Sequence, residues 1–226
     1  MNTDQKLGFI NQFPLFSPLV EDEKLRLAEM MKPVTFSRYS FVYLPGEPSE
    51  QVYFLAKGSV KIGTHSSDGK EVIKSLVHPL AMFGELGLIG EEERQDFAQV
   101  LKEEVQVFVL KVEDFKKIMR QNFDLSSKVM NLFGARLLRA ESKLESLIFK
   151  DARTRIIEFI KESVSDRGRR IGYEMLLKHS LTHQDIANIT CTSRQTVTLV
   201  LNELRKSDLI YFNRGKILVR DMARLA

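Results

Sequence analysis

Apolar residues recur at helical spacing in two short segments between Thr182 and Leu204. In the first segment, Ile186 and Ile189 supply a buried side, and Ala187 is small where a second helix would cross it. The second segment repeats the pattern with Val197, Val200, Leu201 and Leu204. The short turn between the two segments predicts a helix-turn-helix, and this motif points to DNA binding.

The predicted turn contains Cys191, the only cysteine of the chain. Such a turn needs a left-handed backbone, which costs a residue other than glycine roughly 1 to 2 kcal/mol. A single cysteine excludes an internal disulfide, a zinc site built on paired thiolates and an iron–sulfur cluster held by several cysteines of one chain.

Polar side chains crowd the first turn of the second predicted helix, which opens with Thr192–Thr196. Free N–H groups at a helix N-terminus favour phosphate, and Arg and Gln are suited to bidentate contacts with guanine and adenine. We expect base reading by Arg194, Gln195 and Thr198, and phosphate contacts from Thr182, Gln184, Ser193 and Thr196. The alternative makes Ser193 an ordinary helix cap and leaves Arg194 merely exposed.

Between Val34 and Lys111 the chain alternates short strand candidates with Gly, Pro and Asp turn signals, at the spacing of a small barrel or sandwich. The strand candidates include residues 52–56, 59–63, 71–77 and 105–110. Ser67–Gly69 predicts a hairpin turn. Amphipathic helices are expected on either side, at Pro18–Met31 and Val112–Gln121.

A long helical pattern follows, from about Leu125 to Phe149, with an apolar seam at alternating spacings of three and four residues. The seam consists of Met130, Phe133, Leu137, Ala140, Leu144 and Leu147. A seam sustained over about three heptads is typical of a coiled coil, so we expect these residues to hold a homodimer. Alternatively the stripe packs on the chain's own barrel, since Val129, Leu138 and Ile148 widen it.

Asp151 ends this seam and is the expected cap of a new helix at Ala152–Val164. Because one helix follows another, Asp151 is also the expected hinge. After the helix-turn-helix, the chain predicts a hairpin with its turn at Asn213–Gly215, which would form a wing. Arg214 and Lys216 are expected to contact the DNA backbone there, unless the hairpin only closes the core.

Charge is divided unevenly along the 226 residues, of which 43% are hydrophobic, enough for a core in each of two domains. Residues 1–149 carry 19 Lys and Arg against 21 Asp and Glu, a net charge of −2. Residues 150–226 carry 15 against 9, a net charge of +6. The basic excess thus lies with the predicted helix-turn-helix, as phosphate neutralisation requires.

Several classes of protein are disfavoured by what the sequence lacks. No apolar run reaches the roughly 20 residues of a membrane span, and the first residues lack the features of a signal peptide, so we expect a cytoplasmic protein without membrane contact. No nucleophile constellation, metal-ligand pair or phosphate-cradling glycine loop stands out, so we expect neither an enzyme nor a metal site. A dimerisation scaffold without DNA binding is the remaining alternative, and Arg194 and the basic charge oppose it.

Five motifs carry a resemblance to a known family: Leu44–Glu47, Val52–Ile62, Phe83–Ile89 followed by Arg94, Phe149–Ile156 and Thr192–Val197. In this order they resemble the bacterial cyclic-AMP receptor and fumarate/nitrate regulator (Crp/Fnr) family over nearly the whole chain. The resemblance implies an α+β fold with a cyclic-nucleotide-binding-like β-roll at 1–124, a dimerisation helix at 125–150 and a winged helix-turn-helix at 151–226. It also implies an effector-controlled dimer that binds a palindromic promoter site and recruits or blocks RNA polymerase.

The resemblance further implies an effector pocket around the segment that begins at Phe83. Its residues in this chain are Gly84, Glu85, Leu86, Arg94, Gln95, Ala140 and Glu141. Backbone N–H groups near Gly84 and the Arg94 guanidinium would suit a phosphate, and the Glu85 carboxylate would accept from a ribose hydroxyl.

The pocket departs from the cyclic-AMP binders of the family. Gln95 replaces a small hydroxyl residue, Asp96 brings a carboxylate near the phosphate position, and Leu80 replaces a turn glycine. Ala140 and Glu141 replace the Thr-Ser pair that meets adenine. We therefore expect a small effector other than cyclic AMP, and the cofactor is unknown.

Other roles for the same residues stay open. Glu85 and Arg94 could form a structural ion pair in an effector-independent dimer, or the chain could be a cyclic-nucleotide-activated regulator after all. Haem is a further option, since His65 and His78 lie in the barrel half, although their spacing is not that of a defined ligand pair.

Overall fold

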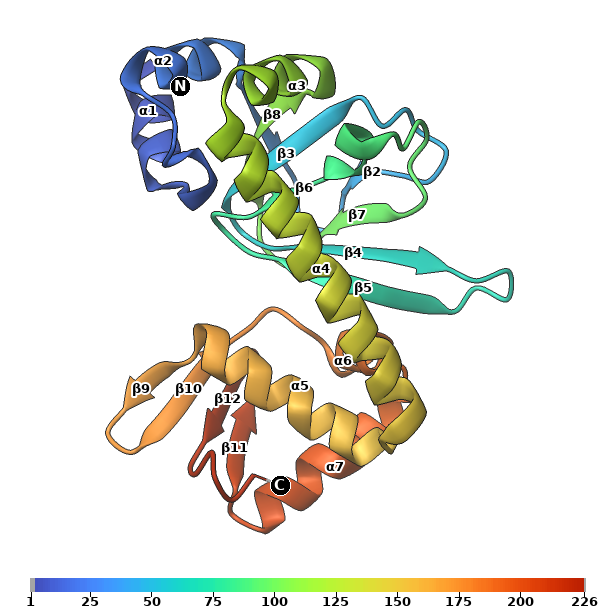
Figure 1. Cartoon of the computed structure of the whole chain (residues 1–226). Helices are drawn as coiled ribbons and strands as arrows, with labels where there is room; N and C mark the ends of the chain where they lie inside the picture. Colours follow the sequence, from blue (N-terminus) through green and yellow to red (C-terminus); the bar gives the residue numbers. More distant parts are fainter. Residues whose placement is uncertain (1–2, 226) are drawn as a thin grey trace. The chain divides into compact units, whose positions relative to one another are not determined.

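The computed structural model describes residues 3–225 and divides into two compact units (Figure 1). Of the described residues, one unit contains 3–64 and Lys74–Leu138, and the other contains His65–Ile73 and 139–225. The tip of one hairpin and the second half of a long helix therefore belong with the C-terminal residues. The division at 1–124, 125–150 and 151–226 stays a prediction.

The first unit is built on two four-stranded sheets. One sheet contains, in spatial order, β1 (Lys32–Phe36), β8 (Val105–Lys111), β3 (Gln51–Lys57) and β6 (Met82–Phe83). The other contains β2 (Phe41–Tyr43), β7 (Phe97–Val100), β4 (Val60–His65) and β5 (Glu71–Val77). The four strand candidates named from the sequence are confirmed as β3, β4, β5 and β8.

Strand β3 has an unbroken apolar run because both of its faces are buried. Side chains alternate across a strand, so Val52 and Phe54 enter one core whereas Tyr53 and Leu55 enter the core shared by the two sheets. The first of these cores also holds Ile10, Phe16, Leu27, Phe115 and Leu125. The sheet of β1, β8, β3 and β6 thus packs against the other sheet on one face and against helices on its other face.

The covering helices match the sequence predictions only in part. Helix α3 (Val112–Gln121) has the expected bounds, whereas α2 (Glu21–Met30) begins later than expected because Val20 is its N-cap and donates its N–H to Glu23 Oε2 at 3.0 Å. Helix α1 (Thr3–Gln12) had no predicted counterpart. Its buried side chain is Ile10, so it lacks the repeated apolar positions that signal a helix.

Helix α4 (Phe123–Phe149) matches the long helical pattern, and α5 (Ala152–Arg167) follows it. The predicted cap is confirmed, since Asp151 Oδ1 accepts the N–H of Thr154 at 2.7 Å. Hydrogen bonding from the Thr154 side chain, and then from this backbone N–H, holds the pKa of Asp151 below its usual value. The role of Asp151 as a hinge stays a prediction. Within residues 3–225, no helix is both long and apolar enough to cross a membrane.

The second unit combines α5 with α6 (His183–Thr190), α7 (Arg194–Lys206) and a small sheet. The sheet order is β11 (Ile210–Asn213), β12 (Lys216–Val219), β10 (Glu174–Lys178) and β9 (Arg169–Ile171). Its core includes Ile156, Ile160, Ile186, Leu201 and Ile217. The β9–β10 hairpin was not predicted, because all three residues of β9 are exposed and give no alternating pattern.

Candidate nucleic-acid interface

Helices α6 and α7 meet at a tight turn through Cys191. Its backbone is left-handed, with φ 50° and ψ 53°, as the sequence predicted. The N–H groups of Cys191 and Thr192 both donate to Ala187 O, the latter at 3.0 Å. Ile186 and Ala187 are buried as expected, whereas Ile189 is only half-buried and Thr190 takes a buried position, donating its hydroxyl to Ile186 O at 2.8 Å.

Arg155 on α5 stabilises this turn by hydrogen bonds, a role that the sequence did not reveal. Its Nε donates to Thr190 O at 2.9 Å and its Nη2 to Cys191 O at 3.2 Å. Its Nη1 donates to Lys150 O, just after the end of α4, at 2.6 Å. One guanidinium therefore binds carbonyls at the ends of two helices, where a cation also complements the helix dipole. The only sequence signal was its place in the Phe149–Ile156 motif.

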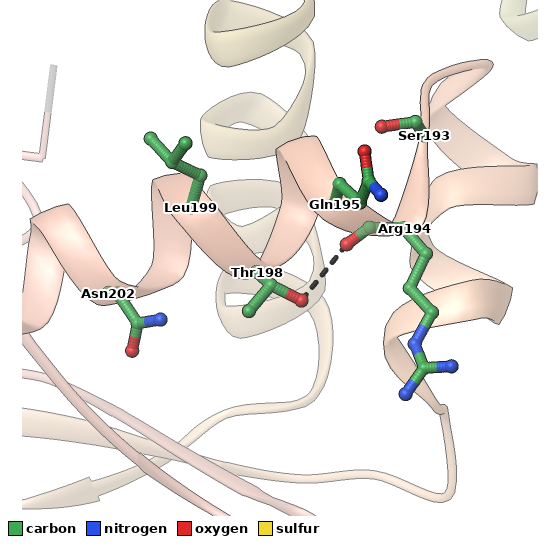
Figure 2. Close-up of a pocket in the computed structure, with 6 residues that line it drawn as sticks. All are labelled: Ser193, Arg194, Gln195, Thr198, Leu199 and Asn202. Carbon is green, nitrogen blue, oxygen red and sulfur yellow. Dashed lines mark hydrogen bonds between the residues drawn. The ribbon is translucent and has the colours of Figure 1, made fainter.

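The first turn of α7 leaves two long polar side chains exposed. Ser193 is the N-cap and accepts the N–H of Thr196 at 3.0 Å, and the two hydroxyl oxygens lie 2.8 Å apart. Arg194 and Gln195 are exposed at the start of the helix, and the Arg194 side chain extends away from it (Figure 2). The cap interpretation of Ser193 is thus confirmed, while its phosphate contact and that of Thr196 stay predictions.

Thr198 differs from the other predicted base readers because its hydroxyl is engaged within the protein. It donates to Arg194 O at 2.9 Å, the dashed line in Figure 2, and lies 2.9 Å from His183 Nδ1. The side chain is half-buried. Burial, and then the nearby charge of Arg194, lowers the pKa of His183.

The N-terminus of α6 holds the other predicted phosphate contacts. Thr182 is the N-cap, and its hydroxyl oxygen accepts the N–H of Asp185 at 3.0 Å while Asp185 accepts the N–H of Thr182 at 2.8 Å. Gln184 is exposed and donates to Asn188 Oδ1 at 2.8 Å. Both side chains lie at a helix N-terminus, where an anion is favoured.

The predicted wing is present as the hairpin of β11 and β12. Asn213 pairs with Lys216 across its turn, and Gly215 has a φ of 77°. Arg214 and Lys216 are both exposed at this turn, in the same compact unit as α7. The wing is fixed to the sheet by the N–H of His179, which donates to Gly215 O at 2.9 Å.

In the first unit, Gly84, Glu85 and Arg94 lie together at the start of η2 (Glu85–Ile89), and their contacts with an effector stay predictions. Gly84 is left-handed, with a φ of 70°, and an added Cβ would lie 2.9 Å from the Tyr53 ring. Arg94, 2% exposed, donates to Gly84 O at 2.8 Å and to Gln51 O.

The alternative in which Glu85 and Arg94 form an ion pair with each other is wrong. The buried Glu85 carboxylate pairs with Arg136 of α4, which also donates to Met82 O at 2.6 Å. Arg94 instead lies 3.7 Å from Glu91 and over the ring of Tyr43. Glu85 Oε2 and Arg94 Nε are buried without a hydrogen-bond partner. Local spacing did not reveal Arg136, because it approaches from a distant helix.

The remaining predicted pocket residues are more exposed. Leu86 is half-buried, and Gln95 is exposed and donates to Glu93 O at 3.1 Å. Asp96 is buried beside Lys74, at 3.5 Å, and burial raises its pKa above the usual value. Ala140 and Glu141 are exposed on α4.

Leu80, His65 and His78 lie in different local environments. Leu80 has a φ of 65°, in keeping with the turn glycine that it replaces. His65 lies 4.0 Å from Glu71, and His78 Nδ1 lies 3.1 Å from the hydroxyl of Ser59. The described part of the chain contains no group of three or more His, Cys, Asp or Glu that could hold a metal ion.

The predicted dimer seam changes its surroundings along α4. At its start, Leu125 and Val129 are buried in the first unit, and Phe133 packs partly against the same core. The alternative interpretation, packing on the chain's own barrel, therefore holds for this part. Met130, in the same stretch, is 56% exposed, and farther along the large apolar side chains of Leu137, Leu144 and Leu147 are 61%, 59% and 39% exposed. Ala140 is exposed between them.

The chain combines a domain of two sheets, in which buried Glu85 pairs with Arg136, with a winged helix-turn-helix that has a basic wing. This combination defines the class of DNA-binding transcription regulators with a regulatory β-roll. A model of the cyclic nucleotide-binding domain matches residues 33–122, and a model of the Crp-like helix-turn-helix domain matches residues 154–226. The chain belongs to the Crp/Fnr family of transcription regulators.

Individual relatives agree with this family. The chain is 30% identical to the global nitrogen regulator of Synechocystis, over 88% of this chain and 90% of the relative. It is 28% identical to the CRP-like cAMP-activated global transcriptional regulator of Mycobacterium tuberculosis, over 88% and 89%. The structure of FixK2 from Bradyrhizobium japonicum shares the fold, with a TM-score of 0.77 at 21% identity over 86% and 95% of the two chains. The two relatives from Synechocystis and Mycobacterium tuberculosis are named as regulators, and both family models are those of regulators, so the chain is a transcription regulator and not an enzyme.

Proposed function

We propose that this regulator acts in the cytoplasm as a homodimer that binds a palindromic promoter site and there contacts RNA polymerase. The observation that carries the DNA-binding part is the exposure of Arg194 and Gln195 in the first turn of α7, in one unit with the basic wing. The dimer is supported by the exposed apolar seam of α4, since exposed side chains of this size at heptad spacing favour a partner helix. The contact with RNA polymerase is inferred from membership of the Crp/Fnr family alone.

Arg194 contacts a guanine and Gln195 an adenine or a neighbouring base in each half-site, with the half-sites about one helical turn apart. Lys216 and Arg214 on the wing neutralise phosphates, as do the polar side chains at the N-termini of α6 and α7. Thr198 is a weaker candidate for base reading, because its hydroxyl already binds Arg194 O.

Selection from a random DNA pool tests this assignment. Arg194→Ala should cost roughly 1 to 3 kcal/mol and relax the consensus at one position. Lys216→Ala is the matched cationic variant, and it should weaken binding to all sequences alike and reduce the salt slope by about one. The same consensus for the wild type and for Arg194→Ala would refute the assignment of the reading residues.

The regulatory signal is a small effector other than cyclic AMP. The charged groups around Gly84 are already paired within the protein, since Glu85 binds Arg136 and Arg94 Nη1 lies 3.7 Å from Glu91 Oε2. A phosphate at Arg94 would therefore have to compete with the Glu91 carboxylate. Asp96 adds a further buried carboxyl nearby. The two unpartnered atoms, Glu85 Oε2 and Arg94 Nε, favour a ligand that can donate to the one and accept from the other.

Calorimetry with cyclic AMP tests the effector proposal, and no binding at micromolar concentration is expected. Micromolar affinity that Arg94→Ala abolishes would instead favour a cyclic-nucleotide-activated regulator like the mycobacterial relative. Mass spectrometry of small molecules released from the purified protein would identify another effector. Thermal shifts would then verify it, since a ligand at 100 times its dissociation constant adds about 2.7 kcal/mol.

A further inference from the structure

We infer that Leu199 reads the 5-methyl group of a thymine in each half-site, next to the bases that Arg194 and Gln195 contact. The inference rests on the proposed DNA-binding function and adds to it a residue that determines specificity. Its first support is exposure, because Leu199 is 59% exposed. The other large apolar side chains of α7 are buried in the core: Val197, Val200, Leu201 and Leu204.

The position of Leu199 on α7 places it on the reading face. Gln195, Leu199 and Asn202 are spaced by four and three residues, so they form one row along the helix. With Ser193, Arg194 and Thr198 they line a shallow depression on the surface of this helix (Figure 2). A single exposed leucine would need no explanation elsewhere. Here it interrupts a row of side chains that suit base edges.

The chemistry of Leu199 selects one base. Thymine is the only base whose major-groove edge carries a methyl group, and apolar side chains contact that group. Leucine offers neither a donor nor an acceptor, so a cytosine amino group or a guanine oxygen beneath it would lose water without gaining a partner. Leu199 thus favours thymine by contact and disfavours the other bases by desolvation.

The expected position of the thymine follows from helix geometry. Four residues of helix separate Gln195 from Leu199, about 6 Å along the axis at 1.5 Å per residue. With base pairs stacked about 3.4 Å apart, the thymine should lie within about two base pairs of the base that Gln195 contacts. Asn202, at the far end of the row, has the amide that suits an adenine edge.

The test replaces thymines of the selected operator by deoxyuridine, one symmetric pair of positions at a time, which removes only the methyl groups. At one position, wild-type affinity should fall about fourfold per half-site, since one buried methyl-sized group is worth about 0.8 kcal/mol. With Leu199→Ala the same substitution should have no effect. Leu199→Met, which keeps an apolar side chain, should retain the sensitivity, and Asn202→Ala should weaken binding but keep it as well.

The outcomes separate this inference from the proposed function. If the random pool yields no consensus, specific DNA binding itself fails. If a consensus is obtained but the wild type tolerates deoxyuridine at every thymine, the Leu199 contact is refuted. Sensitivity that persists in Leu199→Ala refutes it too, because another group then reads the methyl. Far-UV circular dichroism of each variant verifies that it is folded.

Discussion

Replacing Arg155 by lysine tests whether the guanidinium holds the helix-turn-helix in its reading geometry. Arg155 donates to Thr190 O, Cys191 O and Lys150 O at 2.9, 3.2 and 2.6 Å. Lysine keeps the charge and most of the length, but its single ammonium lacks the planar fork that spans separate carbonyls. The substitution therefore keeps the positive charge but removes the planar set of N–H donors.

The expected magnitude follows from where the three carbonyls lie. Lys150 is exposed, so water replaces that hydrogen bond at little cost, whereas Thr190 is buried and Cys191 is half-buried. A hydrogen bond to a charged group contributes about 1.5 to 3 kcal/mol. If lysine retains one of the two inner bonds, the α6–α7 turn should lose that amount. Local opening of the turn should then be roughly 10- to 150-fold more frequent.

Hydrogen exchange followed by mass spectrometry on the full chain measures this opening. Peptides covering residues 186–199 contain the Thr192 amide, which donates to Ala187 O. Arg153→Lys is the matched control, because Arg153 lies on the same helix and 4.0 Å from Glu203. Unchanged exchange in Arg155→Lys, or an equal change in the control, would refute the reasoning.

Two further variants address the dimer seam of α4 and His183, which lies beside Thr198 of α7. Charged residues at the exposed seam should oppose pairing, so the double variant Leu137→Glu, Leu144→Glu should sediment as a monomer with much weaker operator binding; a fully dimeric variant would contradict the assignment. Burial and the charge of Arg194 lower the pKa of His183 in the folded protein. The neutral ring therefore stabilises the fold above the pKa of histidine in the unfolded chain, about 6.5, and this stabilisation is lost as pH falls through the lower pKa of the folded state. The melting temperature should accordingly fall more between pH 7.5 and pH 5.5 in the wild type than in His183→Gln, and parallel curves would show that His183 does not contribute.

The sequence by itself determined the features that rest on short-range periodicity. The helix-turn-helix, the left-handed Cys191 and the Asp151 cap all follow from residues within a few positions of one another, where helix geometry fixes which side chains meet. Strands β3, β4, β5 and β8 were predicted for the same reason, and β3 shows its burial as a continuous apolar run. Helix α1 and strand β9 lack such a pattern, and the sequence did not reveal them.

Only the tertiary structure decided which polar groups are partners. Glu85 pairs with Arg136 rather than Arg94, and Arg155 reaches the turn at Cys191, because folding brings together residues that no local spacing relates. The hydroxyl of Thr198 is occupied within the protein for a similar reason, as α6 places His183 beside it. A buried polar group needs a hydrogen-bond partner, and that partner can come from any part of the chain. The sequence does not show which distant residues the fold brings within hydrogen-bond distance of each other.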